Sequence, residues 1–398
     1  MIAGRNIVCV ASNWFEHPTS KHHVMRILAE RSHVLWVNYH ASRRPALTGS
    51  DSRLIVQRLR AACRGRRRVA PAIDVLSPLL LPLPACRLAR RFNAGMMTRQ
   101  LRAALRALPR RPMQLWLFTP DVPELIGRLR AERVIYYCVD DFAAFRGFDG
   151  ALVSRLERQT LAGADVVIAT SRPLYERLAR LHANTHFVPH GVDFEHFAAA
   201  ATAPPEHVPE ELRRLPRPVL GYLGLIADYV DLELLAAVAR QRPDWSIVLV
   251  GAVRCSTAAL ATLPNVHLLG GRPYEKLPRY CRGFDVGLIP FRMNRLTYSA
   301  NPIKLREYLA AGLPVVSTSL PEVLPYRPAV HSGATADEFI AACLSALARR
   351  TPRDAAARQA LVRDESWRVR VAQLARIVQD GARVRGRSRM PRQTANAG

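Results

Sequence analysis

Two runs of short apolar segments that alternate with helical segments constrain the fold of this 398-residue chain more than any other feature. The first run opens with an apolar segment over 7–11, helical spacing over 20–31 and a second apolar segment over 34–37. Further strands are predicted at 54–56, 73–76, 115–118, 134–138, 166–169 and 187–188. Strands that alternate with helices predict a parallel sheet with helices on both faces.

The same alternation restarts in the second half of the chain. Residues 198–218 are rich in Ala, Pro and Glu without an apolar period, which is typical of a linker. Strands are then predicted at 219–224, 246–251, 266–269, 286–289 and 315–317. We therefore predict an α/β chain with these parts: a Rossmann-like domain over 1–200, a linker over 201–217, a second Rossmann-like domain over 218–365, a helix over 366–385 that packs back on the first domain, and a basic disordered tail over 386–398.

One helix of the second domain has clear signals at both ends. Asn301 is a good N-cap, Pro302 suits the first helical position, and Gly312 followed by Pro314 ends the helix. A helix over about 302–311 is predicted. Unpaired N–H groups and a partial positive charge at its start favour a bound phosphate.

Two side chains on this helix extend the prediction from a phosphate to a nucleotide. Lys304 adds a full positive charge in the first turn, and Glu307 lies on the same face, where its carboxylate can accept both hydroxyls of a ribose. Only three of the 58 basic residues are lysine, namely Lys21, Lys276 and Lys304. A compact ammonium fits a tight phosphate site better than a planar guanidinium, although chance retention on a solvated face is the alternative.

The net charge of +26 is concentrated between residues 41 and 111, which contain 17 arginines but only Asp51 and Asp74 as acids. Such charge is attracted to anionic lipid at about 1 kcal/mol per residue, and also to nucleic acid. A general arginine bias is the alternative explanation. We favour a membrane surface and expect no nucleic-acid partner, because no nucleic-acid motif accompanies the charge.

The seven cysteines show no paired spacing, so we predict a reducing cytoplasm and neither disulfides nor a zinc site. The first residues lack the features of a signal peptide. Prolines interrupt the most apolar segment, 73–85, which therefore cannot span a bilayer as a helix.

Two polar clusters follow predicted strands of the first domain. Asp140 and Asp141 come directly after the strand at 134–138, where charge is unusual unless solvent or substrate reaches it; capping of a helix near Ala143 is the alternative. The segment 14–23 follows the first strand, and its residues His17, Lys21 and His22 are candidates for acceptor binding. Its histidines lack the spacing of metal ligands, so no metal is expected, and Thr19 or Ser20 could simply cap the next helix.

Five motifs, in this order and spacing, resemble those of the GT-B glycosyltransferases that build bacterial exopolysaccharides and cell-surface glycans. They are Val188–Asp193 with Phe197, Gly221–Gly224, Leu269–Tyr274, Phe284–Pro290 and Asn301–Val316. The resemblance implies two Rossmann-like domains facing a deep cleft, with a nucleotide-sugar on the second domain and the acceptor on the first. It also implies catalysis without metal or cofactor, because a helix dipole and basic side chains neutralise the leaving diphosphate.

The resemblance also implies roles for individual donor-side residues. Gly270, Gly271 and Arg272 would meet the base largely through backbone groups, and Gly224 would let a loop approach the phosphates. The N–H groups near Asn301, together with Lys304, would bind the diphosphate, and Glu307 would bind the ribose. The segment 190–193 would position the domain junction.

Two further points concern the chemistry. The segment 134–142 resembles the xanthan-type glucuronosyltransferase, which implies that Asp140 is the general base, with Asp141 as its rival. Ser299 stands where many retaining members carry a glutamate, so contacts to the donor sugar would come from Thr297, Tyr298 or backbone groups, and sugar and stereochemistry stay open.

The predicted function is sugar transfer from a UDP- or GDP-sugar to a lipid-linked glycan at the cytoplasmic face of the bacterial inner membrane, with the basic 41–111 region on anionic lipid. Two alternatives stay open. A sugar-nucleotide epimerase can share this fold, and a nucleic-acid-binding protein would explain the charge but not the helix that begins near Asn301.

Overall fold

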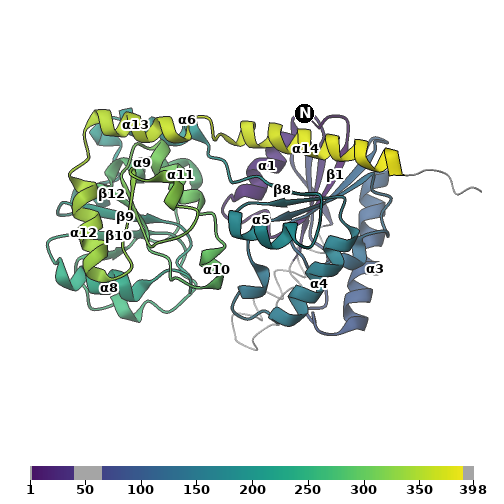
Figure 1. Cartoon of the computed structure of the whole chain (residues 1–398), viewed down its shortest axis with the longest axis horizontal. Helices are drawn as coiled ribbons and strands as arrows, with labels where there is room; N and C mark the ends of the chain where they lie inside the picture. Colours follow the sequence, from purple (N-terminus) through teal and green to yellow (C-terminus); the bar gives the residue numbers. More distant parts are fainter. Residues whose placement is uncertain (1, 40–64, 389–398) are drawn as a thin grey trace, which may run out of the picture.

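The computed structural model describes residues 2–39 and 65–388, without the side chains of 381–388. The predicted strand at 54–56, part of the basic 41–111 region and most of the predicted tail lie outside the described residues. Two α/β units stand side by side, and the helix α14 (Trp367–Ser388) lies along the edge of the first unit (Figure 1). The predicted α/β class with two sheets is confirmed.

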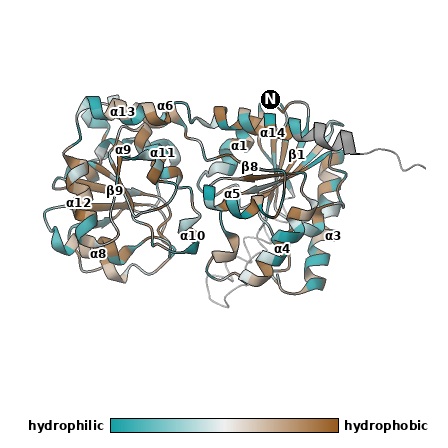
Figure 2. Cartoon of the chain, viewed as in Figure 1, coloured by the Kyte–Doolittle hydropathy of each residue, from teal (hydrophilic) through white to brown (hydrophobic). Residues whose placement is uncertain are grey.

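The first unit contains an eight-stranded sheet in the order β3-β4-β2-β1-β5-β6-β7-β8. Its strands are β1 (Asn6–Ala11), β2 (His33–Asn38), β3 (Arg66–Ala70), β4 (Ile73–Leu76), β5 (Met113–Leu117), β6 (Arg133–Cys138), β7 (Val166–Ala169) and β8 (Thr185–Phe187). Every residue of β1 and β2 is buried, as expected for strands covered on both faces. Figure 2 shows most strands of both sheets as hydrophobic.

The prediction of a purely parallel sheet is wrong at one edge. Strand β3 pairs with β4 in antiparallel register, and its three arginines gave no apolar signal in the sequence. Arg66 and Arg68 both contact the buried carboxylate of Asp74 at 3.3 Å, so ion pairs hold this edge strand where apolar contacts are few.

Helices cover both faces of the first sheet. The main ones are α1 (Ser20–Ala29), α3 (Arg87–Arg106), α4 (Gly150–Gly163) and α5 (Arg172–Ala179). The face of α14 that contains Trp367, Val371 and Leu374 is buried in the core that α1 and β1 also share. The carboxyl end of the described chain thus packs on the first unit.

The second unit contains a six-stranded parallel sheet in the order β11-β10-β9-β12-β13-β14. Its strands are β9 (Val219–Leu223), β10 (Ser246–Val250), β11 (Val266–Leu268), β12 (Val286–Ile289), β13 (Val315–Ser317) and β14 (Val330–Ser332). Around it lie α8 (Leu232–Gln241), α9 (Leu277–Gly283), α10 (Arg295–Tyr298), α11 (Ile303–Ala310), α12 (Ala336–Leu347) and α13 (Pro352–Val362). The short edge strand β14 was not predicted, because its sequence Val-His-Ser contains only one apolar residue.

The segment 201–217, interpreted as a linker, carries regular structure. It includes the end of α6 (Phe194–Thr202), a 3₁₀ turn at Pro205–His207 and the helix α7 (Glu210–Arg213). Val208 and Leu212 are buried in the core of the second unit. Two apolar anchors among charged residues are enough to fix this segment against α9, although they form no sequence period.

None of the helices within the described residues is long and apolar enough to cross a membrane.

Candidate active site between the two units

The helix α11 starts the donor-side half of the candidate site, and its beginning differs from the prediction. The N-cap is Pro302, without a side-chain cap, and not Asn301. The buried Asn301 side chain donates from Nδ2 to the Thr170 carbonyl (2.7 Å) and to Glu322 (2.8 Å), and accepts from Arg306 (2.6 Å). Asn301 therefore ties the start of α11 to the first unit instead of capping the helix. The end is as predicted, with Gly312 at a φ of 76°.

Lys304 and Glu307 lie one turn apart on α11, and their side chains form an ion pair of 2.8 Å. The Glu307 side chain is only 4% exposed, whereas that of Lys304 is 19% exposed. An ammonium has three donors, so Lys304 can hold the carboxylate and still offer N–H groups to a phosphate. The two predicted donor-binding side chains are thus brought together at the amino end of one helix.

Two glycines, Gly224 and Gly251, lie in the loops that follow β9 and β10. Gly224 follows β9 with a φ of 151°, which disfavours a residue with a side chain. A Cβ on Gly251, at the end of β10, would meet the Gly224 carbonyl oxygen at 1.7 Å. The close backbone approach requires Gly251, and its φ requires Gly224, at the carboxyl edge of the sheet, where ligands of parallel sheets bind.

The loop after β11 presents backbone and not the Arg272 side chain. The Arg272 guanidinium donates to Tyr280 Oη (2.6 Å) and Leu269 O (2.5 Å), and it forms an ion pair with Glu211 at 3.1 Å. Next to it, a Cβ added to Gly271 would find only the amide nitrogen of Ala252 at 3.9 Å. Arg272 therefore shapes this loop and leaves the space in front of Gly271 open.

Asp140 is the acidic group of the acceptor-side half, directly after β6. It is half-buried, and burial raises the pKa of its carboxyl to about 6, against a smaller lowering by the charge of Lys21 and a raising by Asp141. Its charge also contributes, after burial, to the raised pKa of Tyr229 on the second unit. Asp140 thus lies where the two units face each other, with a pKa suited to exchange protons near neutral pH.

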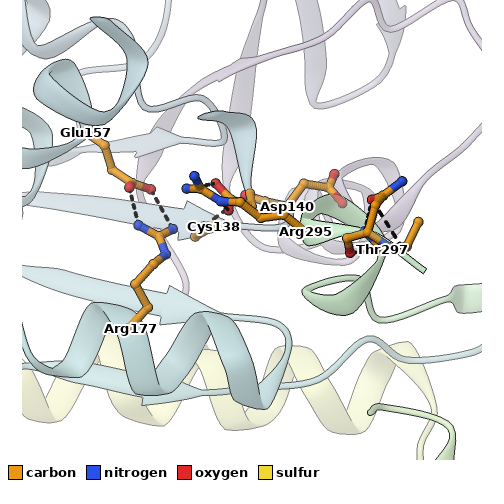
Figure 3. A network of polar contacts seen from close by, with 8 residues as sticks. Cys138, Asp140, Glu157, Arg177, Arg295 and Thr297 are labelled. Atoms are coloured by element: carbon orange, nitrogen blue, oxygen red, sulfur yellow. Dashed lines mark hydrogen bonds and ion pairs between the residues drawn. The ribbon is translucent and has the colours of Figure 1, made fainter. Parts of the chain in front are cut away.

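Asp141 has a different environment from its neighbour. Its buried carboxylate accepts from Arg295 Nε of α10 at 2.7 Å, an ion pair that joins the two units. Figure 3 shows the Arg295 side chain reaching toward the end of β6, where Asp140 lies. Asp141 precedes the 3₁₀ turn Phe142–Ala144 but makes no side-chain cap to it, so the structure does not support helix capping. Because the carboxylate of Asp141 is paired with Arg295, Asp140 is the better candidate for the base.

The segment 14–23, which includes the loop after β1 and the first turn of α1, brings two of its three candidates toward this edge. Lys21 donates to Ser12 Oγ at 2.8 Å and is close enough to Asp140 for its charge to lower that pKa. His17 is exposed, and its ring lies 5.8 Å from that of Tyr274 on the second unit. Partial desolvation by neighbouring groups and then the charge of Lys304 lower the pKa of His17, so this side chain lies close to the donor-side half.

The assignment of His22 to the acceptor side is wrong. The ring is buried between Trp14 and Trp36, and its Nδ1 atom accepts the Thr19 amide at 3.1 Å in a capping box at the start of α1. Burial, then the charge of Lys21, lower the pKa of His22 to about 4. His22 is therefore a packed core residue that fixes the loop geometry.

Two observations concern the position of Ser299 and its neighbours. Thr297 is buried, and its amide and hydroxyl are engaged in a capping box with Asn294, whereas Tyr298 is exposed. The Ser299 carbonyl accepts from Ser171 Oγ of the first unit at 2.7 Å. Of the predicted donor-sugar contacts, the Tyr298 side chain is thus the more accessible.

Arg295 is the residue of this site that sequence reasoning missed. Its partner is 154 positions away, and an arginine in an arginine-rich chain carries no local signal. Within residues 2–39 and 65–388 no group of three His, Cys, Asp or Glu side chains is arranged to hold a metal ion.

Sequence comparisons match this chain to one protein family and to a relative. Residues 217–349 match the family model of the glycosyl transferases group 1, and this range contains every donor-side residue discussed above. A Bacillus subtilis (strain 168) protein, provisionally described as the teichuronic acid biosynthesis glycosyltransferase TuaH, is 30% identical over 249 residues. The alignment covers 58% of this chain and 62% of that relative.

The structural comparisons cover nearly the whole chain at low sequence identity. The Anabaena protein Alr3699/HepE, solved with UDP and glucose, has a TM-score of 0.66 at 12% identity, over 95% of this chain and 100% of its own. The Escherichia coli trehalose-6-phosphate protein bound with UDP-2-fluoro glucose gives 0.64 at 14%, over 94% and 99%. The Burkholderia multivorans trehalose 6-phosphate synthase gives 0.66 at 13%, over 97% and 100%.

The two units and their shared edge have the GT-B fold. Within it, residues 217–349 match the family model of the group 1 glycosyl transferases, so the predicted resemblance to that group is confirmed.

Proposed function

We propose that the protein is a glycosyltransferase that moves a sugar from a nucleotide-sugar to a hydroxyl of a lipid-linked glycan, in the synthesis of a bacterial cell-surface polysaccharide. The observation that carries the proposal is the pair of Lys304 and Glu307 on α11, inside the segment that matches the group 1 glycosyl transferases. Asp140 on the first unit supports it, because its charge reaches Tyr229 of the second unit. The relative named for teichuronic acid biosynthesis supports the polysaccharide context.

The donor half binds the diphosphate at the start of α11. Lys304 and the first N–H groups of the helix neutralise the charge that grows on the leaving diphosphate. Glu307 accepts the ribose hydroxyls while Lys304 holds its other oxygen. We take the nucleotide to be uridine, because two of the similar structures contain UDP or a UDP-sugar derivative.

The acceptor half supplies the base. Asp140 takes the proton of the acceptor hydroxyl as its oxygen attacks the anomeric carbon, and the bond between that carbon and the diphosphate oxygen breaks. Burial holds the pKa of Asp140 near 6, so the carboxylate is ionised at pH 7 and still basic enough to accept a proton. We assign His17 and Lys21 to acceptor binding, because both belong to the segment that follows β1 on the first unit and Lys21 acts electrostatically on Asp140.

We further propose that transfer needs no metal ion, since α11 and Lys304 supply positive charge at the leaving group. Activity that persists in EDTA supports this part. Activity that EDTA abolishes and Mg²⁺ restores contradicts it, without touching the donor assignment.

Ligand-dependent stabilisation gives a direct test of the donor site. UDP at 100 times its dissociation constant raises the unfolding free energy by about 2.7 kcal/mol, a shift of several degrees in melting temperature. We expect UDP and UDP-sugars to raise the melting temperature and Lys304→Met to abolish the shift. If neither UDP nor GDP stabilises the wild-type protein, the proposed function is wrong.

A further inference from the structure

We propose that the loop 79–84 and the outer stripe of α3 form a docking surface for an anionic phospholipid bilayer. The helix α3 lies on the side of the first unit that faces away from the second (Figure 1). The proposal builds on the proposed function only in its choice of a lipid-linked acceptor, and it replaces the broad basic region 41–111 by a defined surface.

Exposed apolar side chains are concentrated at the start of this surface. Sixteen large apolar side chains are exposed among the described residues, and five of them lie within the fourteen positions of 79–92. They are Leu79 (43%), Leu81 (43%), Leu83 (52%), Leu88 (77%) and Phe92 (52%). A concentration of this kind on a water-facing surface marks an interaction site.

The loop is built to keep its leucines outside. Leu80 is buried and anchors the extended loop, while its neighbours Leu79 and Leu81 face solvent. The Asn93 side chain of α3 accepts from Leu81 N at 2.8 Å and donates to Leu81 O at 2.9 Å. Arg90 donates to the Pro84 carbonyl at 2.8 Å, so side chains of α3 hold the loop backbone at Leu81 and at Pro84.

The exposed side chains along the outer stripe of α3 change from apolar at its amino end to basic at its carboxyl end. The spacing of Leu88, Phe92, Gly95, Arg99, Arg102 and Arg106 puts them on one face, opposite the buried face that includes Met97 and Leu101. The stripe spans about 27 Å along the helix axis.

The basic end of the stripe has no acidic partner among the described residues. Arg99, Arg102 and Arg106 line a hollow of about 380 Å³ together with Arg128, and none of the four forms an ion pair within that part of the chain. Like charges this close favour an anionic partner that supplies several phosphates. Leucine and phenylalanine at one end and arginines at the other match a bilayer interface, in which apolar side chains enter the acyl boundary and guanidinium groups meet the headgroups.

A fluorescent label reports contact with the bilayer directly. Cys86 is exposed beside this surface, whereas Cys9, Cys138, Cys281 and Cys343 are buried. After Cys63→Ser and Cys255→Ser, an environment-sensitive dye on Cys86 should shift to the blue with vesicles of phosphatidylcholine and phosphatidylglycerol. Vesicles of phosphatidylcholine alone should give a much smaller shift.

Matched variants separate this surface from general charge and hydrophobicity. Leu88→Glu with Phe92→Glu should weaken vesicle binding at least tenfold, whereas Leu344→Glu with Leu361→Glu, two leucines of similar exposure on the second unit, should not. The triple variant Arg99→Ala, Arg102→Ala and Arg106→Ala should weaken vesicle binding about 100-fold. The control variant Arg213→Ala, Arg240→Ala and Arg353→Ala removes the same charge from exposed positions of the second unit. It should change vesicle binding far less.

The outcomes are decisive for the surface and separate from the donor site. Equal losses of vesicle affinity in a variant and in its matched control overturn the proposal. It is also overturned if the wild-type protein is a dimer that Leu88→Glu with Phe92→Glu dissociates without changing vesicle binding. The melting temperature of every variant, measured without ligand, shows whether it is folded. A protein that binds vesicles but not UDP keeps this surface and loses the proposed function, and the reverse result does the opposite.

Discussion

The two halves of the candidate site each present a carboxylate, but they surround it in opposite ways. Glu307 on the second unit is buried and pairs with Lys304 at 2.8 Å in the same helix. Asp140 on the first unit ends a strand, and burial raises the pKa of its carboxyl to about 6. A carboxylate committed to a cation is suited to hold a ligand, whereas a desolvated carboxylate near neutrality is suited to move a proton.

The neighbouring pair Asp140 and Asp141 shows the same contrast over one peptide bond. Arg295 crosses from the second unit to Asp141, and no such ion pair holds the carboxylate of Asp140 within the described residues. The tie to Arg295 fixes the strand end, so that Asp140 is presented to the space between the units. In the proposed mechanism, Asp141 orients the strand end and Asp140 reacts.

The largest expected effect follows from removing the base. Asp140→Asn should lower kcat by about 10²- to 10⁴-fold, because an amide cannot take the acceptor proton. UDP stabilisation of the melting temperature should be unchanged, since the donor half is intact. In the wild type, kcat/KM should fall about tenfold per pH unit below pH 6, as protonation of Asp140 removes the base.

Asp141→Asn is the matched control for that comparison. It removes the same charge one residue away but breaks the contact to Arg295, so we expect a loss of less than about tenfold in kcat and a small loss of stability. Transfer rates measured for the two variants under identical conditions decide between them. A larger loss for Asp141→Asn would reverse the assignment of the base.

The second effect concerns the buried pair on α11. Lys304→Met leaves Glu307 buried without its cation and should lower the unfolding free energy by about 3 kcal/mol. The double variant Lys304→Met with Glu307→Gln should recover much of that loss, because no uncompensated charge remains. Urea unfolding of the two single variants and the double variant measures the coupling, and strictly additive losses would show that the pair is not a unit.

The smallest effect sharpens the electrostatic link between loop and strand. Lys21 lowers the pKa of Asp140, so Lys21→Met should move that pKa above about 6 and shift the acid limb of the kcat/KM profile to higher pH by less than about one unit. Lys276→Met removes another of the three lysines at an exposed position on the second unit and serves as the control. A shift to lower pH, or the same shift in both variants, would contradict the link.

The sequence alone predicted most strands because each is a local apolar run. The segments 7–11, 73–76 and 166–169 lie within or match observed strands. It failed for β3, where three arginines form a strand through ion pairs with Asp74, and for Asn301, whose capping pattern was correct for an isolated helix. In both cases a contact made by the folded chain outweighed the local preference.

By itself, the sequence determined the two alternating runs, the helix that carries Lys304 and Glu307, and the carboxylates at the end of β6, because these depend on spacing within a few residues. Only the tertiary structure decided that Arg295 occupies Asp141, that Asn301 joins the units and that His22 belongs to the core. The partners of Asp141 and Asn301 lie 154 and 131 positions away, and no local pattern encodes which distant side chain will satisfy a buried polar group.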